Sequence, residues 1–448
     1  MSHSYRTTPI NSATIPEGIP FIIANELAER FSYYGMRAIL IVFMTHYLVD
    51  AQGQPDSMSP ETATAYYHLF IAITYFTPFF GALLADGCLG KYRTIILLSL
   101  VYCLGHFVLA LDITRTGLLI GQSLIALGAG GIKPCVSAHL GDQFSDSNQA
   151  KLNSVFSWFY LAINTGAFIS MLLVPWLLEH YGAAYAFALP GVLMALATFI
   201  FWSGRYRFVH IPAAGFKAIY ASLKHTGTTT VIPLLSIYGF IAVFWSLFDQ
   251  IGSAWVLQAE HLHNQIFGIT LLPAQLQAAN PLLIMLLTPL FYQWLYPKLN
   301  RYWPLTYMNK MTMGLFIAAL AFAWVTWVQL QIDHGMTLSI AWQLPAYVLL
   351  TSAEIMISVT CLEFSYTQAP YAIKSLIMAF YLASVGVGNL LTSLINFILE
   401  HSASHTWLTG AAYFGLFTGL MLLTAIAFSM YSRRYTEKTY WHSTISHE

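Results

Sequence analysis

Long apolar stretches recur along the whole chain and are separated by short polar loops. About twenty consecutive apolar residues cross the hydrocarbon core of a bilayer as a helix, and a helix satisfies its own backbone hydrogen bonds there. The pattern therefore predicts an all-α membrane protein with twelve transmembrane helices. The expected segments are 21–48, 66–86, 94–111, 117–140, 152–178, 185–203, 230–256, 278–296, 305–328, 341–364, 375–399 and 407–431.

Composition supports an integral membrane protein. Hydrophobic residues make up 57% of the 448 residues and charged residues only 8%, compared with about 25% charged residues in soluble domains. The formal net charge is zero, so nothing indicates a nucleic-acid partner. The first twenty residues lack the basic start and short apolar run of a cleavable signal peptide. No ligand spacing connects the cysteines, which we interpret as small core residues rather than a metal site or disulfides: Cys88, Cys103, Cys135 and Cys361.

Basic residues predict the orientation, because cytoplasmic loops carry an excess of lysine and arginine. With twelve spans and a cytoplasmic N-terminus, the outside loops hold only Arg115. We therefore expect a multi-pass protein of the plasma membrane (the inner membrane if bacterial) with both termini in the cytoplasm. The inside loops and tails hold fourteen basic residues: Arg6, Lys91, Arg93, Lys151, Arg205, Arg207, Lys217, Lys224, Lys298, Arg301, Lys374, Arg433, Arg434 and Lys438.

The longest basic connection divides the chain into two groups of six spans. Such halves are typical of transporters of the major facilitator type, whose substrate site lies near the bilayer midplane between the halves. The expected organisation is a cytoplasmic tail, a six-helix bundle, a cytoplasmic linker, a second six-helix bundle and a second cytoplasmic tail. These parts correspond to residues 1–20, 21–204, 205–229, 230–431 and 432–448.

The first segment carries charges at helical spacing. Residues 26, 29, 30, 33, 34 and 37 share one helix face, and each charge facing lipid would cost about 2.5–3.5 kcal/mol. Glu26 and Arg30 are four residues apart and can pair, whereas we expect Glu29 to reach Lys133 in the fourth segment. The small residues 128–131 before Lys133 let another helix approach closely. A purely structural ion-pair cluster is the alternative to a network that takes up a proton.

Other buried charges suit a zwitterionic substrate. Arg37 and Lys133 belong to the first half and Glu354 to the second, so a cavity between the halves would be positive on one wall and negative on the other. Arginine grips a carboxylate with two bonds, and a glutamate can pair with an ammonium group. Tyr33, Tyr34 and Tyr75 share faces or depths with these charges, although most tyrosines of a membrane protein serve packing or interfacial belts. Asp249 and His68 lie in the outer halves of their segments, where a lone histidine is usually only hydrated.

Five motifs in chain order resemble those of the proton-dependent oligopeptide transporter family of the major facilitator superfamily. The first is similar to the family's ExxERFxYYG motif, and the second to the superfamily's loop between helices 2 and 3. The others resemble the helix 4 lysine motif, the helix 5 signature and the helix 10 signature of eukaryotic members. They are Glu26–Gly35, Gly81–Lys91, Gly131–Pro134, Phe159–Gly166 and Val359–Pro370.

The resemblance implies residue roles. Glu26, Glu29 and Arg30 would couple protons with Lys133, and Arg37 and Lys133 would face the peptide carboxylate. His68 and Asp249 resemble the helix 2 histidine and helix 7 aspartate of animal peptide transporters, which implies a part in proton entry. The other implied residues would receive the peptide's amino end (Asn164, Asn280 and Glu354) or line the pocket (Tyr33, Tyr34, Tyr75 and Tyr381).

Three departures from the family are visible. The linker 205–229 is too short for the two extra helices that many bacterial relatives carry between the bundles. Residues 329–340 leave no room for the large outer domain of animal members. Tyr381 stands where the family often has a pocket tryptophan, which changes one side-chain subpocket.

We therefore expect a monomeric, proton-coupled symporter that imports di- and tripeptides by alternating access, with protons as the coupling ion and no other cofactor. A carrier of nitrate or another small anion is the nearest alternative, although Glu354 would oppose it. A membrane-embedded hydrolase would need a nucleophile–base set or a metal pair, and His106 and His139 are isolated. The sequence does not distinguish a transporter from a peptide sensor.

Overall fold

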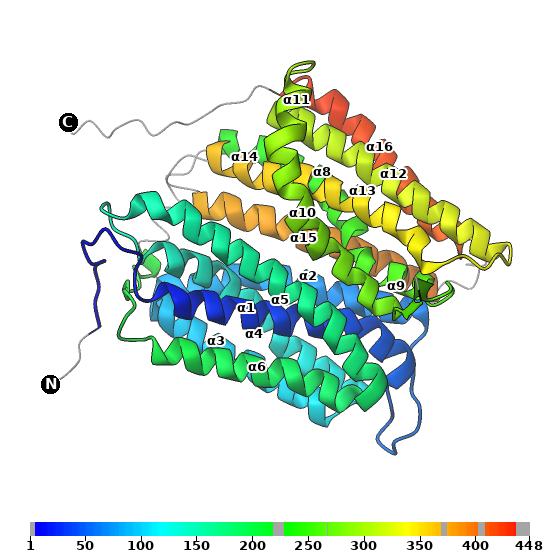
Figure 1. Ribbon diagram of the computed structural model, residues 1–448, viewed down its shortest axis with the longest axis horizontal. Coiled ribbons are helices and arrows are strands. Elements are labelled where there is room, and N and C mark those ends of the chain that lie inside the picture. Colours follow the sequence, from blue (N-terminus) through cyan, green and yellow to red (C-terminus); the bar gives the residue numbers. More distant parts are fainter. Residues whose placement is uncertain (1–4, 218–227, 267, 369–373, 402–407, 436–448) are drawn as a thin grey trace.

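The protein consists of long helices in two bundles that lie side by side (Figure 1). The computed structural model describes residues 5–217, 228–266, 268–368, 374–401 and 408–435. The first bundle contains α1 (Ile19–Val42), α2 (Pro60–Leu84), α3 (Lys91–Leu111), α4 (Arg115–Gly141), α5 (Leu152–Tyr181) and α6 (Ala183–Ser203).

The second bundle is built from six further helical segments, several of them interrupted. The helices are α8 (Thr228–Phe248), α9 (Ala254–Ala259), α10 (Ala279–Leu290), α11 (Tyr296–Asn300), α12 (Tyr307–Asp333), α13 (Leu344–Glu354), α14 (Thr360–Gln368), α15 (Lys374–His401) and α16 (Ala411–Ser432). Two short antiparallel strands, β1 (Gln265–Ile266) and β2 (Ile269–Thr270), form a hairpin between α9 and α10.

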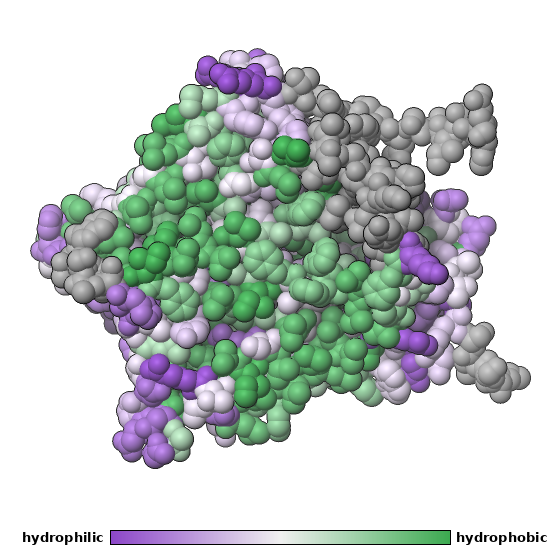
Figure 2. Space-filling view, turned by 180° about the vertical axis from the view of Figure 1, so that it is seen from behind, coloured by the Kyte–Doolittle hydropathy of each residue, from purple (hydrophilic) through white to green (hydrophobic). Residues whose placement is uncertain are grey.

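Eleven helical segments among the described residues are long and apolar enough to cross a membrane. The twelfth expected segment is α1, which has 24 residues and continues as a π-helical turn over Phe43–Tyr47. Its hydropathy is lowered by the polar face that the sequence predicts. A band of apolar side chains covers the molecule between polar ends (Figure 2), as expected for a protein surrounded by lipid. The fold is the twelve-helix major facilitator fold.

Some helix ends differ from the sequence prediction for identifiable reasons. α2 begins at Pro60 rather than at residue 66, because the Ser59 side chain accepts a hydrogen bond from the Thr62 amide at 3.2 Å and caps the helix. The predicted continuous helix 230–256 is wrong, since α8 ends at Phe248 and a 3₁₀ turn precedes α9. At this break a Cβ on Gly252 would clash with the Tyr67 hydroxyl of α2, so the irregular backbone permits close contact between the bundles.

The small residues of α4 allow tight helix packing, as predicted. A Cβ on Gly128 would lie 2.7 Å from the Tyr102 Cβ of α3, and a Cβ on Gly81 of α2 would lie 2.5 Å from the Gly131 Cα. The helices that approach this run most closely are therefore α2 and α3. This packing fixes the backbone immediately before Lys133.

Two ends of the molecule are distinguished below. The terminal end holds Tyr5 and Tyr435, and the distal end holds the α1–α2 and α12–α13 connections; α1 begins at the left in Figure 1. At the terminal end the segment before α1 packs against the segment after α6. The His210 amide donates to the Arg6 carbonyl at 2.7 Å, and the Tyr5 ring stacks on the His210 ring with 4.2 Å between centroids.

Candidate functional site: charged groups between the two bundles

A buried ion cluster lies within α1. Arg30 Nε contacts Glu26 Oε1 at 2.9 Å and also contacts Glu29 Oε2. The predicted ion pair between Glu29 and Lys133 is wrong in this conformation, because Arg30 is close enough along the same helix to hold both carboxylates. Lys133 still interacts electrostatically with both, so the four groups form one electrostatic unit.

Lys133 is a partly buried cation that contacts no acidic side chain of the described residues. Its Nζ lies 3.9 Å from the centroid of the Tyr75 ring and 5.6 Å from that of the Tyr33 ring, and aromatic faces stabilise such a cation. Among the described residues no carboxylate approaches Lys133 within 4.0 Å. The Lys133 side chain is partly exposed, which leaves its charge available to an anionic group.

Glu354 provides the opposite charge from the second bundle. It ends α13, immediately before a π-helical turn at Ile355–Val359, a feature that is frequent at functional sites. Asn280 Nδ2 donates to Glu354 Oε2 at 2.8 Å and to the Thr351 hydroxyl at 3.1 Å. No basic side chain of the described chain forms an ion pair with this carboxylate.

Tyrosines lie between Lys133 of the first bundle and Glu354 of the second. Tyr75 packs against the hydrophobic cores of both bundles and interacts electrostatically with Glu354. Tyr160 on α5 interacts electrostatically with both Glu354 and Tyr34. Several of the groups around this region keep accessible surface although they lie near mid-span: Tyr34, Tyr75, Lys133, Asn280 and Glu354.

The other predicted pocket residues, Tyr33, Tyr381 and Asn164, each have a different environment. Tyr33 is buried beneath Lys133, and its ring stacks on Phe70 with 6.2 Å between centroids. The Tyr381 hydroxyl lies 3.1 Å from the Ser358 hydroxyl, next to the π-helical turn. Asn164, which is predicted to receive the peptide's amino end, donates from Nδ2 to the Tyr160 carbonyl of its own helix at 2.9 Å.

Arg37 joins the two bundles through Asp249, and it also interacts electrostatically with Lys133 and Glu354. Its guanidinium contacts Asp249 of the second bundle, and its Nε donates to the Tyr67 hydroxyl at 2.7 Å. All three side chains are buried. The predicted contact of Arg37 with a substrate carboxylate is therefore blocked in this conformation by the Asp249 carboxylate.

His68 belongs to the same distal network. Its Nδ1 donates to Asn389 Oδ1 at 2.7 Å, so Nε2 of the neutral ring accepts from the Ser253 hydroxyl at 2.9 Å. Asn389 Nδ2 donates in turn to Asp249 Oδ2 at 2.6 Å. Thus the predicted proton-site residues His68 and Asp249 are brought together, linked through a residue of α15.

Further bonds close the distal side. Gln277 Nε2 donates to the Ala38 carbonyl at 3.0 Å, and the Ser393 hydroxyl donates to the Ala65 carbonyl at 2.8 Å. Together with the contacts of Arg37 and His68, these bonds join the two bundles in the distal half of the molecule. The bundles are therefore held together at the distal end.

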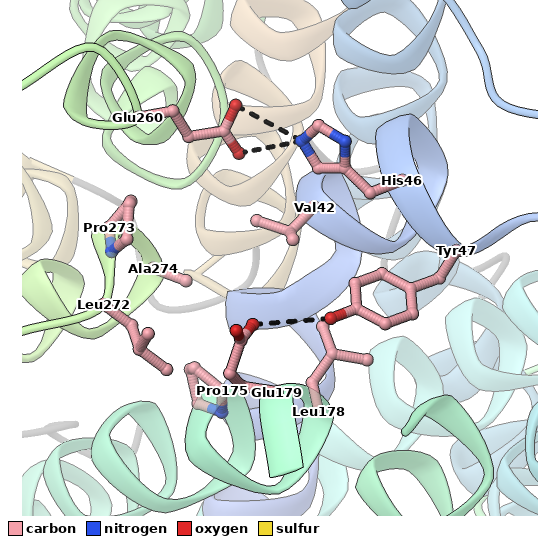
Figure 3. Close-up of a pocket in the computed structure, with 10 residues that line it drawn as sticks. All are labelled: Val42, His46, Tyr47, Pro175, Leu178, Glu179, Glu260, Leu272, Pro273 and Ala274. Carbon is pink, nitrogen blue, oxygen red and sulfur yellow. Dashed lines mark hydrogen bonds and ion pairs between the residues drawn. The ribbon is translucent and has the colours of Figure 1, made fainter. Parts of the chain in front are cut away.

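A shallow vestibule opens at the distal end between the bundles (Figure 3). Its volume is about 590 Å³. His46 Nε2 lies 3.3 Å from Glu260 Oε1 across the bundles, and the Tyr47 hydroxyl lies 3.5 Å from Glu179. The lining is otherwise apolar: Val42, Pro175, Leu178, Leu272, Pro273 and Ala274.

Sequence reasoning missed Tyr67, Asn389 and Ser253. Asn389 had a detectable signal, because an amide that follows two glycines in an apolar helix needs a hydrogen-bonding partner in the membrane. Ser253 lies at the break between α8 and α9, which the apolar pattern did not reveal. Tyr67 looked like one of many tyrosines.

Comparison with known proteins places this geometry in a family. The sequence model described as PTR2, POT family, matches residues 92–226 and 213–412. Solute carrier family 15 member 1 of the dog is 37% identical over 379 residues, which cover 71% of this chain and 52% of the dog protein. The chain thus spans about half the length of the curated relatives that it matches.

Solved structures match over almost their full length. An auto-inhibited POT family peptide transporter is 34% identical, with a TM-score of 0.86 and coverage of 96% of this chain and 99% of the other. A proton-dependent oligopeptide (POT) family transporter is 37% identical, with a TM-score of 0.78 and coverage of 92% and 100%. The chain belongs to the POT family of membrane transporters.

Proposed function

We propose that this protein is a proton-coupled symporter that imports di- and tripeptides by alternating access. The observation that carries the proposal is the pair of opposite charges, Lys133 and Glu354, which come from opposite bundles and lack ion-pair partners among the described residues. A short peptide is a zwitterion whose charged ends are separated, and it matches such a pair. The names of the related structures, which include a proton-dependent oligopeptide transporter, support the same substrate class.

In the membrane, we place the distal end outside and both termini in the cytoplasm of a plasma membrane. The distribution of lysine and arginine supports this orientation, since Arg115 at the distal end is the exception to a cytoplasmic set. With this orientation the contacts around Arg37 and Asp249 close the outer side. The described conformation then presents the central groups towards the cytoplasm.

In the substrate complex, Lys133 binds the peptide carboxylate and Glu354, held by Asn280, binds the amino end. Tyr33, Tyr34, Tyr75 and Tyr381 contact the backbone and side chains of the peptide. Arg37 becomes available to the carboxylate when Asp249 withdraws, and Asn164 becomes available if it releases the carbonyl of its own helix. Both walls belong to one chain, so we infer that a monomer transports.

Proton coupling depends on the Glu26, Glu29 and Arg30 cluster. When Glu29 takes up a proton it loses its charge and releases Arg30, so the ion cluster around Lys133 rearranges. His68 and Asp249 admit protons when the outer contacts open. Each elementary charge that moves inward gains about 2.3 kcal/mol per 100 mV, which is enough to accumulate a neutral peptide severalfold.

The test is uptake of labelled dialanine into proteoliposomes with and without an inward pH gradient. Gradient-driven uptake in the wild-type protein is the expected result, and competition by dialanine but not by nitrate separates peptide transport from anion transport. Recovery of intact peptide separates transport from hydrolysis.

For the coupling role, we expect Glu29→Gln to abolish gradient-driven uptake while exchange of labelled for unlabelled peptide (counterflow) stays measurable. The variant removes the charge that Arg30 holds and keeps the side-chain volume. Full gradient-driven uptake by this variant would refute the coupling role of Glu29.

A further inference from the structure

A second group of buried polar side chains lies inside the first bundle, away from the interface between the bundles. His106 and Tyr102 are four residues apart on α3, and both are fully buried. Their rings have centroids 5.1 Å apart and an interplanar angle of 36°. α3 packs against α4 and α6, so these two side chains point into the bundle rather than towards lipid.

Polar atoms in this region lack protein partners. The Tyr102 hydroxyl, Glu29 Oε1, the Ser99 hydroxyl and both amide atoms of Asn25 are buried and form no hydrogen bond with the described residues. A buried polar group left unpaired costs about 1–3 kcal/mol, and internal water commonly bridges such groups. The set therefore identifies a polar tract inside an otherwise apolar bundle.

The tract leads to the coupling carboxylate. Tyr102 interacts electrostatically with Glu29 and with Arg30, and α1 and α3 pack against the same two helices, α4 and α6. At 1.5 Å per residue, His106 lies about 7.5 Å along α3 from Leu111 at the distal end, and Tyr102 about 13.5 Å. His106 is thus the member of the group nearest the distal surface.

The surroundings of His106 suit a neutral imidazole that can pass a proton. Both ring nitrogens are buried without a hydrogen-bond partner among the described residues, and no charged side chain of those residues acts on the ring. A Cβ on Gly191 of α6 would lie 2.7 Å from the His106 Cβ, so this glycine lets α6 pack directly against the histidine. Among the described residues, Tyr102 is the titratable side chain in ring contact with it.

We propose that His106 and Tyr102 form a proton relay that carries protons from the distal side to Glu29 through the interior of the first bundle. This inference rests on the proposed transport function. The imidazole accepts a proton at one ring nitrogen and releases the proton of the other. The Tyr102 hydroxyl accepts that proton, directly or through water, and gives its own to Glu29 Oε1. One proton moves in total, the imidazole is left as its other neutral tautomer, and rotation of the imidazole ring and of the hydroxyl resets the relay.

Arg30 controls when the relay can deliver. In the described conformation Arg30 contacts both α1 carboxylates, and a carboxylate held by a guanidinium has little tendency to accept a proton. Delivery therefore requires that Arg30 leaves Glu29. This requirement prevents the relay from leaking protons while Glu29 communicates with the terminal side.

The experiment compares gradient-driven uptake of dialanine with counterflow in two variants and a control. His106→Gln keeps a hydrogen-bonding side chain that cannot carry a proton, and Tyr102→Phe removes only the hydroxyl. The control is His139→Gln, because His139 is also a buried histidine of the first bundle but lies towards the terminal end against Phe201 and Phe208. We expect both relay variants to lose at least tenfold in gradient-driven uptake, with counterflow within twofold of the wild type and the control unchanged.

The outcomes separate the relay from simpler roles. Gradient-driven uptake by His106→Gln and Tyr102→Phe within twofold of the wild type, with the same pH profile, would overturn the relay. An equal fall in counterflow and driven uptake in the folded variants would assign a structural role instead and would also overturn it. Wild-type protein without any gradient-driven uptake would remove the proposed function itself, a result distinct from wild-type uptake that the variants retain.

Discussion

We expect the ion pair between Arg37 and Asp249 to stabilise the conformation in which the distal side is closed. In Asp249→Asn the side chain keeps its shape but loses its charge, and Arg37 is left buried without its counter-ion. The new amide also cannot accept from both Arg37 and Asn389, since one of its two polar atoms is a donor. The variant therefore destabilises the conformation in which the distal side is closed.

The magnitude follows from the burial of the pair. Arg37 and Asp249 have side-chain exposures of 8% and 3%, and removing one partner of a buried ion pair costs about 3–5 kcal/mol. In the open conformation water can reach Arg37, so most of this cost falls on the closed conformation. The ratio of closed to open molecules should fall roughly 10²- to 10³-fold, at about 1.4 kcal/mol per factor of ten.

The assay is a distance measurement between spin labels by double electron–electron resonance. Labels at Gln52 and Met336 report on the two bundles at the distal end, where both residues are exposed. Cys88 and Cys103, which keep accessible surface, are replaced by serine. We expect the wild type to show mainly the short distance and Asp249→Asn to gain a longer one.

The matched control is Asp56→Asn. Asp56 pairs with Arg115 at 2.6 Å within the first bundle, and both side chains are exposed, so this change should not alter the distance distribution. Identical distributions for the wild type and Asp249→Asn would refute the reasoning, because they would mean that the ion pair does not favour the closed conformation.

Two further changes test packing and substrate recognition. Gly81→Ala places a methyl group against the backbone of Gly131, so it should lower the free energy of unfolding by about 1–3 kcal/mol and the melting temperature in detergent. Its control is Gly239→Ala, whose methyl group would meet no atom within 4 Å. Equal melting temperatures for the two variants would contradict the packing argument. Glu354→Gln removes the charge that we propose binds the peptide's amino end, so the apparent KM for dialanine should rise roughly 10- to 100-fold if about 1.5–3 kcal/mol is lost. Competition by N-acetyl-dialanine, which lacks the ammonium group, should change little, and an equal loss for both peptides would argue against the assigned role of Glu354.

The helices could be predicted from the sequence because their physical cause is local. Apolar length identified the spans, and the spacing of Glu26, Glu29 and Arg30 placed these residues on one face of α1. The small residues before Lys133 indicated tight packing, although the sequence could not show that α2 and α3 are the helices that approach it.

The partners of the buried charges could not be predicted in the same way. Arg30 competes with Lys133 for Glu29, and the outcome depends on side-chain distances that spacing along the chain does not determine. Arg37 contacts Asp249 instead of the central region because the bundles are closed at the distal end, and a sequence does not specify which conformation is adopted. The roles assigned to these residues in binding and coupling stay predictions.

The polar face of α1 has a consequence for biosynthesis. Four charges within one segment make residence in lipid expensive, and the helix is covered by α5, whose Gly166 lies against the Leu27 carbonyl and the Phe31 amide. α5 is synthesised more than a hundred residues after α1. The nascent segment must therefore wait in a protected, partly aqueous environment until its neighbours arrive, so membrane integration of this chain is cooperative rather than helix by helix.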